Sequence, residues 1–409
     1  MSVFVLATLD TKGQEAAYLC RRLRALEVDV RLIDTGCVGE PTVDADVTRE
    51  ELFASGDTSL DELRRLADRG KAIAAAAAAA RKRLLREHAM ANVDGVLGIG
   101  GSAGTTIATA AMRALPLGVP KLMVSTLASG QVRQYVGDKD VLMLNSVVDI
   151  LGVNRISRVI FDEAARAMAG MAIFPRDPEP GDHRPLVAAT MFGVTTPCIE
   201  RARAVLVEAG FEVLVFHATG GGGQAMESLI EEGLIAGVLD ITTTEIADEL
   251  IGGVLSAGPH RLSAATRCGV PQVVSVGATD MVNFHARDTV PEKFSDRIFN
   301  EHNPTVTLMR TTPEENQRIG TEIGRKIASA GEKAAIFLPQ QGVSAIDAVG
   351  QPFDDPQARA ALFAAIEEHA GNVACCRIDC HINDTEFAIA VANHLIALIR
   401  KTSAGSSAT

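Results

Sequence analysis

The segment between residues 94 and 112 restricts the possible fold more than any other part of the chain. It reads Asp94-Gly-Val-Leu-Gly-Ile-Gly-Gly-Ser-Ala-Gly-Thr-Thr-Ile-Ala-Thr-Ala-Ala-Met112, which is a short apolar strand, a glycine loop and a helix of small residues. Glycines let a ligand approach the backbone closely, and the free amides at the start of a helix favour an anion. The segment therefore predicts a strand–loop–helix unit that holds a phosphate on residues 98–106.

Three known loop patterns can be compared with this segment. The dinucleotide pattern G-x-G-x-x-G/A fits Gly98, Gly100 and Ala103, but the acid expected about 20 residues later is missing. A Walker loop would need a lysine before Thr105, and none is present. The G-x-S-x-G elbow of hydrolases fits with Ser102 as nucleophile, but it needs a histidine and an acid later in the chain. Phosphate binding is favoured, with a ligand-free tight turn and a nucleophilic serine as alternatives.

Composition limits the class of protein. The chain has 409 residues, too many for one hydrophobic core, which predicts two domains. Its net charge of −12 comes without a basic run, so neither nucleic acid nor a membrane is expected as a partner. The seven cysteines form no secreted-type framework, and the group at 375–381 is better explained by buried thiols than by a metal. With no signal region before the first strand, a reducing, cytoplasmic location is expected.

Short apolar runs alternate with helical patterns along the chain, which is typical of parallel α/β sheets. Strands are predicted in the first half at 3–7, 29–34, 95–99, 121–125 and 141–145. In the second half they are predicted at 186–191, 212–217, 237–240, 272–276, 306–309, 334–338 and 373–379. The alanine run 74–80 predicts one long helix over 59–88.

The proline-rich, charged stretch 175–185 predicts a linker between subdomains 1–174 and 186–401, and a disordered tail is expected at 402–409. Both halves run strand, helix, strand in the same order, and both place Gly-Val-Pro before a strand. We therefore expect two Rossmann-like, doubly wound parallel-sheet subdomains that arose by internal duplication. The glycine loop occurs in the first copy alone, so the two copies should bind different ligands.

Ligands of parallel sheets sit beyond the carboxyl ends of the strands, so the polar residues there are site candidates. In the first half, Lys12 is expected to offset phosphate charge and Asp34 to hold a ribose hydroxyl, while Asp10 fits a site residue or a helix cap equally. The complete predicted nucleotide site consists of Thr8, Asp10, Lys12, Asp34, Gly100, Gly101, Ser102, Ala103, Gly104, Thr105, Thr106, Ser125, Ser129 and Gly130.

In the second half, histidines and acids follow successive predicted strands. The predicted catalytic set is His217, Asp240, Asp280, His302 and His381. Clustered charged groups are costly to desolvate without a partner, so this rim predicts a second pocket for catalysis, a small metabolite or a metal. No spacing specifies metal ligands, and the metal is unknown. Unrelated polar loops, or an interface between domains or subunits, are the alternatives.

Several motifs together resemble those of the Tm-1-like ATP-binding family. These proteins are uncharacterised in bacteria and fungi, and a plant relative is the inhibitor domain of the tomato mosaic virus resistance protein. The matching segments are Thr8–Lys12, Gly98–Thr106, Met123–Gly130, Gly220–Glu227, Asp280–Phe284 and His302–Pro304. The resemblance covers nearly the whole chain and implies two Rossmann-like subdomains, ATP on the first of them, and a homodimer. Ala103 departs from the family's frequent Gly-Gly-Ser-Gly-Gly-Thr, a small change that still permits phosphate approach.

The leading hypothesis is an ATP-binding protein with its phosphates on the glycine loop and Mg²⁺ as a candidate metal. A small-metabolite or catalytic pocket is expected on the C-terminal subdomain, facing the cleft between the two. The alternative is a non-enzymatic dimer whose partner binding is gated by nucleotide, and a hydrolase acting through Ser102 is less favoured. The crowded second rim favours an enzyme and the missing P-loop lysine favours a binding module, so the sequence leaves that choice open.

Overall fold

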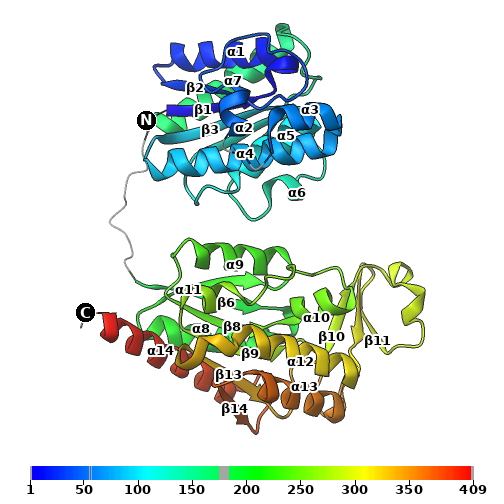
Figure 1. Ribbon diagram of the computed structural model, residues 1–409. Coiled ribbons are helices and arrows are strands. Elements are labelled where there is room, and N and C mark those ends of the chain that lie inside the picture. Colours follow the sequence, from blue (N-terminus) through cyan, green and yellow to red (C-terminus); the bar gives the residue numbers. More distant parts are fainter. Residues whose placement is uncertain (1, 55, 57, 175–183, 407–409) are drawn as a thin grey trace. The chain divides into compact units, whose positions relative to one another are not determined.

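The computed structural model describes the chain except for residues 1, 55, 57, 175–183 and 407–409 (Figure 1). It divides into two compact units, residues 1–180 and 181–409, here called the N-terminal and C-terminal units. The division falls within the predicted linker 175–185, most of which lies outside the described residues. Each unit is built on a parallel sheet with helices on both faces, which confirms the predicted doubly wound α/β class.

The sheet of the N-terminal unit has five parallel strands in the order β2-β1-β3-β4-β5. Each overlaps a predicted strand, because each is a short apolar run with few turn residues. The strands are β1 (Ser2–Ala7), β2 (Val30–Asp34), β3 (Val93–Gly100), β4 (Lys121–Ser125) and β5 (Leu142–Asn145).

Two layers of helices cover this sheet. Val3 and Val5 of β1 pack in the cluster on the side of α1 (Leu9–Ala25) and α7 (Arg155–Ile173). Phe4 and Leu6 alternate with them and pack on the side of α4 (Arg69–Ala89) and α5 (Ser102–Met112). The shorter helices are α2 (Arg49–Ala54), α3 (Leu60–Leu66) and α6 (Arg133–Val136).

The single helix predicted over 59–88 is wrong, because the chain breaks it into α3 and α4. Ala67 takes a left-handed conformation with φ 49° and ends α3. Asp68 then begins α4 by accepting a hydrogen bond from the Lys71 amide at 3.0 Å. Aspartate is among the strongest N-caps, a signal that the alanine run obscured. The break places residues 63–73 along the wall of a cavity at the edge of the sheet.

The C-terminal unit repeats the topology of the first with one added strand. Its six-stranded sheet has the order β14-β13-β9-β8-β6-β7, and every pairing is parallel. Read from β7, the first five strands follow the order of the N-terminal sheet, which is what a duplication predicts. The strands are β6 (Leu186–Met191), β7 (Glu212–His217), β8 (Gly237–Thr242), β9 (Gln272–Gly277), β13 (Ala334–Pro339) and β14 (Ala374–Ile378).

A separate antiparallel sheet is inserted between β9 and β13. It has the order β10-β12-β11, formed by β10 (Met281–Phe284), β11 (Phe299–Asn303) and β12 (Val306–Arg310). Residues 306–309 were predicted as a strand of the parallel sheet, and the segments around 283 and 302 as loops at strand ends. Both predictions are wrong, because the apolar run of β12 pairs with two neighbouring strands that sequence patterning did not reveal.

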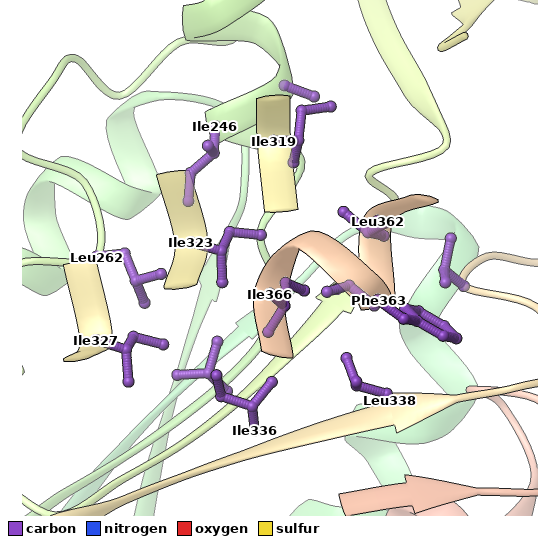
Figure 2. Packing of buried hydrophobic residues seen from close by; sticks show 14 of the residues in the cluster. Ile246, Leu262, Ile319, Ile323, Ile327, Ile336, Leu338, Leu362, Phe363 and Ile366 are labelled. Carbon is purple, nitrogen blue, oxygen red and sulfur yellow. The ribbon is translucent and has the colours of Figure 1, made fainter. Parts of the chain in front are cut away.

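Helices α12 (Pro313–Ile327) and α13 (Pro356–His369) pack together on one face of the C-terminal sheet. Figure 2 shows Ile319, Ile323 and Ile327 along one side of α12, near Ile366 of α13 and Ile336 of β13, all within one buried cluster. This four-residue spacing is the apolar stripe of an amphipathic helix. The remaining helices of the unit are α8 (Thr196–Glu208), α9 (Gly221–Glu231), α10 (Thr244–Ile251), α11 (Ala264–Cys268) and α14 (Thr385–Ser406).

The last helix runs further than the sequence suggested. Helix α14 continues to Ser406, so the tail predicted to be disordered from residue 402 is helical up to that point, and 407–409 lie outside the described residues. Within the described chain, no helix combines the length and apolar character needed to cross a membrane.

Candidate functional site

The N-terminal unit has a crevice where its strand order reverses. Strand β1 leads into α1 on one face of the sheet, while the neighbouring β3 leads into α5 on the other. In open parallel sheets, ligands bind beyond the carboxyl ends of the strands at such a switch point. A cavity of about 670 Å³ opens there. Its wall comes from the β1–α1 turn, the segment after β2, the start of α5 and residues 63–73.

The glycines before α5 serve packing as well as access. A Cβ on Gly100 would lie 2.8 Å from the Gly104 Cα, and one on Gly104 would lie 3.1 Å from the Ile99 carbonyl oxygen. Gly100 therefore needs glycine whether or not a ligand binds, and a side chain at Gly104 would be tight against the Ile99 carbonyl. Gly101 is different, since a Cβ there would meet nothing closer than Thr126 Oγ1 at 3.7 Å. Gly101 is the N-cap residue of α5 and has no side chain to cap it, and no hydrogen bond from a described side chain to the amides of residues 102–104 takes its place.

The hydroxyls near the glycine loop fall into two groups. Thr105 and Ser125 are buried, and their hydroxyls lie 2.7 Å apart, so they join α5 to β4 rather than facing a ligand. Ser102 and Thr106 are exposed on the first turns of α5, where the Thr106 hydroxyl donates to the Ser102 carbonyl oxygen at 2.9 Å. In the part of the chain that the structure describes, no histidine or acid hydrogen-bonds to Ser102, so the serine lacks the partners of a nucleophile.

Ser129 and Gly130 are exposed in the turn that follows β4. They are not among the residues of the cavity wall. Their predicted role at the nucleotide therefore has no support from this geometry.

Two predicted charged ligands are engaged in the protein instead. The Lys12 ammonium donates to the Ile150 carbonyl oxygen and is not part of the cavity wall. The Asp34 carboxylate is buried, pairs with Arg49 Nε at 2.7 Å and accepts the Leu9 amide at 3.1 Å. These contacts give no support to the predicted roles of Lys12 toward phosphate and of Asp34 toward ribose, and both roles stay predictions.

Asp10 and Thr8, two of the predicted nucleotide-site residues, lie in the cavity wall. Asp10 Oδ2 accepts the Gly39 amide at 3.1 Å, which orients the carboxylate. The hydroxyls of Thr8 and Thr11 lie 2.8 Å apart beside it. The polar part of the wall is thus formed by the β1–α1 turn, opposite the start of α5 with Ala103.

The cations of the cavity were missed at the sequence level. Arg64 and Arg69 line it, together with an apolar group formed by Val38, Leu63, Ala72, Ile73 and Ile107. Arg64 also donates through Nε to the Cys37 carbonyl oxygen at 3.4 Å. The N-cap aspartate before α4 was the available signal, since it would have ended α3 between these two arginines.

In the C-terminal unit, Asp240 belongs to a buried ion network. Arg261 is fully buried and donates to both carboxylate oxygens of Asp240, at 2.5 and 2.7 Å, and to Glu245 at 2.6 Å. A buried guanidinium surrounded in this way holds the fold together and presents no free acid to a substrate. The predicted catalytic role of Asp240 is therefore not supported. The sequence could not reveal its partner, Arg261, because that residue lies 21 positions further along the chain.

The glycine run 220–223 accommodates an acid of the same unit. Glu245 Oε1 accepts the amides of Gly220 at 2.7 Å and Gly223 at 3.1 Å, at the start of α9. A Cβ on Gly223 would lie 2.2 Å from Glu245 Oε2, and one on Gly222 would lie 1.9 Å from the His217 carbonyl oxygen. These glycines leave room for the carboxylate and the preceding strand.

Asp280 and His381 meet at one residue. Ser344 donates its hydroxyl to Asp280 Oδ2 at 2.8 Å, and its carbonyl oxygen lies 2.9 Å from His381 Nε2. The other ring nitrogen of His381 accepts the Asn383 amide at 3.1 Å, so both nitrogens are engaged. Burial, together with the neighbouring Asp347 carboxylate, raises the pKa of Asp280 to about 7.

The segment that carries Ser344 crosses the carboxyl edge of the C-terminal sheet. The Ala345 amide donates to the Val194 carbonyl oxygen after β6, at 3.0 Å, and the Ala278 amide donates to the Val343 carbonyl oxygen, at 2.9 Å. These two backbone hydrogen bonds join loops that follow different strands, so they hold the loops at this edge in place relative to one another.

The two remaining histidines of the predicted set lie elsewhere. His217 is exposed at the end of β7 and packs edge-on against Phe192, with ring centroids 5.5 Å apart. His302 is exposed on β11 of the inserted sheet. The five predicted catalytic residues therefore divide among separate surroundings. Among the described residues, no group of three or more histidines, cysteines, aspartates and glutamates is arranged to hold a metal ion.

Comparison with known families covers both units. The N-terminal domain of an uncharacterised protein family, UPF0261, matches residues 1–177, and its C-terminal domain matches residues 184–399. The chain belongs to this family. It is 48% identical over 404 residues to a UPF0261 protein of Clostridium tetani, covering 98% of this chain and 99% of that protein.

The tomato relative bears out the resemblance seen in the sequence. The ToMV resistance protein Tm-1(GCR237) of Solanum lycopersicum is 39% identical over 422 residues, which cover 98% of this chain and 56% of the tomato protein. Among solved structures, the esterase domain of a Rhodothermus marinus protein aligns with 56% of this chain and 90% of its own, at 13% identity and a TM-score of 0.29. A likeness this low supports no conclusion about function.

Proposed function

We propose that this UPF0261 protein binds ATP in the cavity of the N-terminal unit, with the phosphates at the start of α5. The observation that carries the proposal is one of position. The uncapped N-terminus of α5 borders a cavity of about 670 Å³, and that cavity lies at the switch point of the sheet. Backbone amides at a helix start carry partial positive charge and are a common phosphate site. The volume is within the range of small-molecule sites.

The lining of the cavity is of two kinds, as a nucleotide is. Threonine hydroxyls and the first turn of α5 provide hydrogen-bond donors, which suit phosphate oxygens. Ile73, Leu63 and Ile107 provide apolar surface that suits a purine ring, and Arg64 and Arg69 line the same cavity. This division supports ATP over inorganic phosphate as the ligand.

The proposed role is binding, with the nucleotide as a regulating ligand. Asp240 is held by Arg261, and both nitrogens of His381 are engaged, so these two members of the predicted catalytic set are already bonded within the C-terminal unit. A homodimer whose partner binding depends on ATP is the version we favour. The small-metabolite pocket expected on the C-terminal unit stays a prediction.

The test uses a charge placed on the cavity wall. Ala103 is the second residue of α5, where an acid stabilises the helix through its dipole while repelling a bound phosphate. We expect Ala103→Glu to weaken ATP binding at least tenfold by isothermal titration calorimetry of the full chain, about 1.4 kcal/mol.

The matched control is Ala103→Gln, which has the same size without the charge and should bind within about threefold of wild type, roughly 0.7 kcal/mol. Equal ATP affinity in wild type and Ala103→Glu, with the circular dichroism spectrum unchanged, would contradict the proposal.

A further inference from the structure

Helix α3 borders two cavities of the N-terminal unit. Its Leu63 and Arg64 line the proposed nucleotide cavity. A second cavity, of about 370 Å³, is lined by residues of both α2 and α3, and Arg64 is again among them. Protein interiors are normally close-packed, so an element bordered by two cavities gives up few contacts when it moves. The surroundings of α3 therefore leave it room to shift.

Few side chains of α3 hold it to the rest of the unit. Leu60 and Leu63 are buried, and the other five of its seven residues are exposed. Arg64 Nε donates to the Cys37 carbonyl oxygen at 3.4 Å, which is long for a hydrogen bond. The next helix, α4, is held by several buried side chains between residues 72 and 84. Because segments with few buried contacts open most easily, α3 is the loosely held element and α4 the fixed one.

The connection between these two helices has the character of a hinge. Ala67 takes φ 49° and ψ 25°, a left-handed conformation that is unfavourable for a residue with a Cβ. Its amide donates to the Leu63 carbonyl oxygen at 3.2 Å, and Asp68 begins α4 directly afterwards. Strained single residues are concentrated at sites that bind ligands or switch conformation. A rotation at Ala67 would move α3 while α4 stays in place.

An exposed apolar side chain lies in the wall of the nucleotide cavity. Val38 lines this cavity and is 78% exposed. Removing apolar surface from water is favourable, so a segment that covers the cavity gains stability from shielding Val38. The exposure of Val38 is what an open form of the site would show.

We propose that α3 is a lid on the nucleotide site, which turns about Ala67 when nucleotide binds and brings the Arg64 guanidinium onto the purine ring. The inference rests on the proposed ATP site and adds a conformational step to it. Guanidinium groups stack on flat aromatic rings. A lid that closes after the ligand has entered acts mainly on the rate at which the ligand leaves. Closure also changes the outer surface of the unit, which gives ATP a means to alter the binding of a partner.

The first test is hydrogen exchange of the full chain, read by mass spectrometry with and without saturating ATP. A peptide covering residues 60–67 should exchange at least fivefold more slowly with ATP, because closure stabilises the whole of α3. The control is a peptide covering α6, which contributes no residue to the cavity wall and should exchange equally in both samples.

The second test separates a lid from a fixed charge. For Arg64→Met, we expect ATP affinity to fall at least fivefold by calorimetry. In stopped-flow measurements with a fluorescent ATP analogue, the dissociation rate should rise by the same factor and the association rate should stay within twofold. A fixed guanidinium that only attracts phosphates would act on the association rate instead.

Arg65→Met is the matched control. It removes the same charge from the next residue of α3, which is not part of the cavity wall. This variant should bind ATP within twofold of wild type and release the analogue at the wild-type rate.

Three results would overturn the inference. These are unchanged exchange of residues 60–67 in a sample where calorimetry shows ATP bound, an Arg64→Met variant with no loss or with a loss in the association rate, and an equal loss in Arg65→Met. Wild-type exchange decides the matter even if Arg64→Met fails to fold. Absence of ATP binding by wild type would refute the proposed function, and the lid with it.

Discussion

Helices α5 and α9 each begin in a glycine-rich turn after a parallel strand, α5 after β3 and α9 after β7, yet their first amides have different surroundings. At α9, the carboxylate of Glu245 accepts the amides of Gly220 and Gly223, and Arg261 holds that carboxylate in place. At α5, the N-cap is Gly101, which has no side chain to cap the helix, and a cavity borders its first turn. The start of α9 thus has an internal anion, and no described side chain fills that part at the start of α5.

The contrast shows what a glycine-rich turn can and cannot indicate. The run 220–223 has more consecutive glycines than the loop before α5, but its glycines make room for an internal side chain. A glycine loop therefore marks a close approach to the backbone, and the group that approaches can belong to the protein. The open cap distinguishes the two cases.

The largest effect is expected when Arg261, the cation that holds the Glu245 carboxylate at the start of α9, is removed. Arg261→Leu should destabilise the C-terminal unit by about 3–5 kcal/mol, because it leaves three buried or half-buried acids without their guanidinium. Urea unfolding of the full chain, with hydrogen exchange read by segment, measures the loss.

The exposed pair between Arg267 and Glu231 provides the control for that substitution. Arg267→Leu should cost less than about 1 kcal/mol, because both side chains are more than half exposed. A loss below 1 kcal/mol for Arg261→Leu would mean that the internal anion is not held as described.

A paired serine substitution sharpens the comparison of the two loops. Gly222→Ser should cost about 1–3 kcal/mol, since its Cβ would lie 1.9 Å from the His217 carbonyl oxygen. Gly101→Ser should change stability by less than about 0.5 kcal/mol, because there is space at this position and serine is a favoured N-cap. Both are measured by the same unfolding method, and equal losses in the two would show that the α5 loop is as tightly packed as the α9 loop.

The smallest expected effect is on the pH dependence of stability, at the carboxyl edge of the C-terminal sheet where Asp280 lies. Asp280 is raised to a pKa of about 7 by burial and by Asp347, so its protonated form is favoured in the folded state. Its stabilising contribution is complete below about pH 4, the ordinary pKa, and is lost as the pH rises to about 7. Arg310 and Arg359 are the cations that face Asp347.

Asp280→Asn should therefore flatten the decline of the melting temperature between pH 4.5 and 7.5. Over this range the melting temperature of wild type should fall by roughly 2–4 °C more than that of the variant, which corresponds to about 1 kcal/mol in a domain of this size. Asp288→Asn, at an exposed position, should leave the wild-type slope unchanged. If the melting temperatures of Asp280→Asn and wild type change equally with pH across this range, protonation of Asp280 does not affect stability.

Much of the fold followed from the sequence, because each parallel strand is an apolar run that can be recognised by itself. The sites followed less well, because their roles depend on distant partners. Lys12 and Asp34 looked available at strand ends, yet Ile150 and Arg49 engage them. Thr8, Asp10 and Ala103, which were predicted as nucleotide-site residues, do line a cavity, since their position depends on where β1 and β3 end.

Two errors have a common physical cause. The alanine run concealed the break at Ala67, and with it the arginines of the cavity, because helix propensity in a window outweighs one capping residue. The inserted strands β10 and β11 were missed because antiparallel pairs of four or five residues leave little periodicity to detect. In the first case the decisive interaction is a local cap at Asp68, and in the second it is hydrogen bonding to β12, which for β10 lies more than 20 residues away.

The carboxylate of Glu245 is covalently part of the chain that it binds, and this sets its occupancy. A tethered group acts at a high effective concentration, so the start of α9 stays filled whatever the surrounding solution contains. At the start of α5, no carboxylate of the described chain plays this part, so under the proposed function its occupancy would follow the concentration of ATP. The proposal therefore gives the chain one helix start that is always filled and one whose filling changes with the solution.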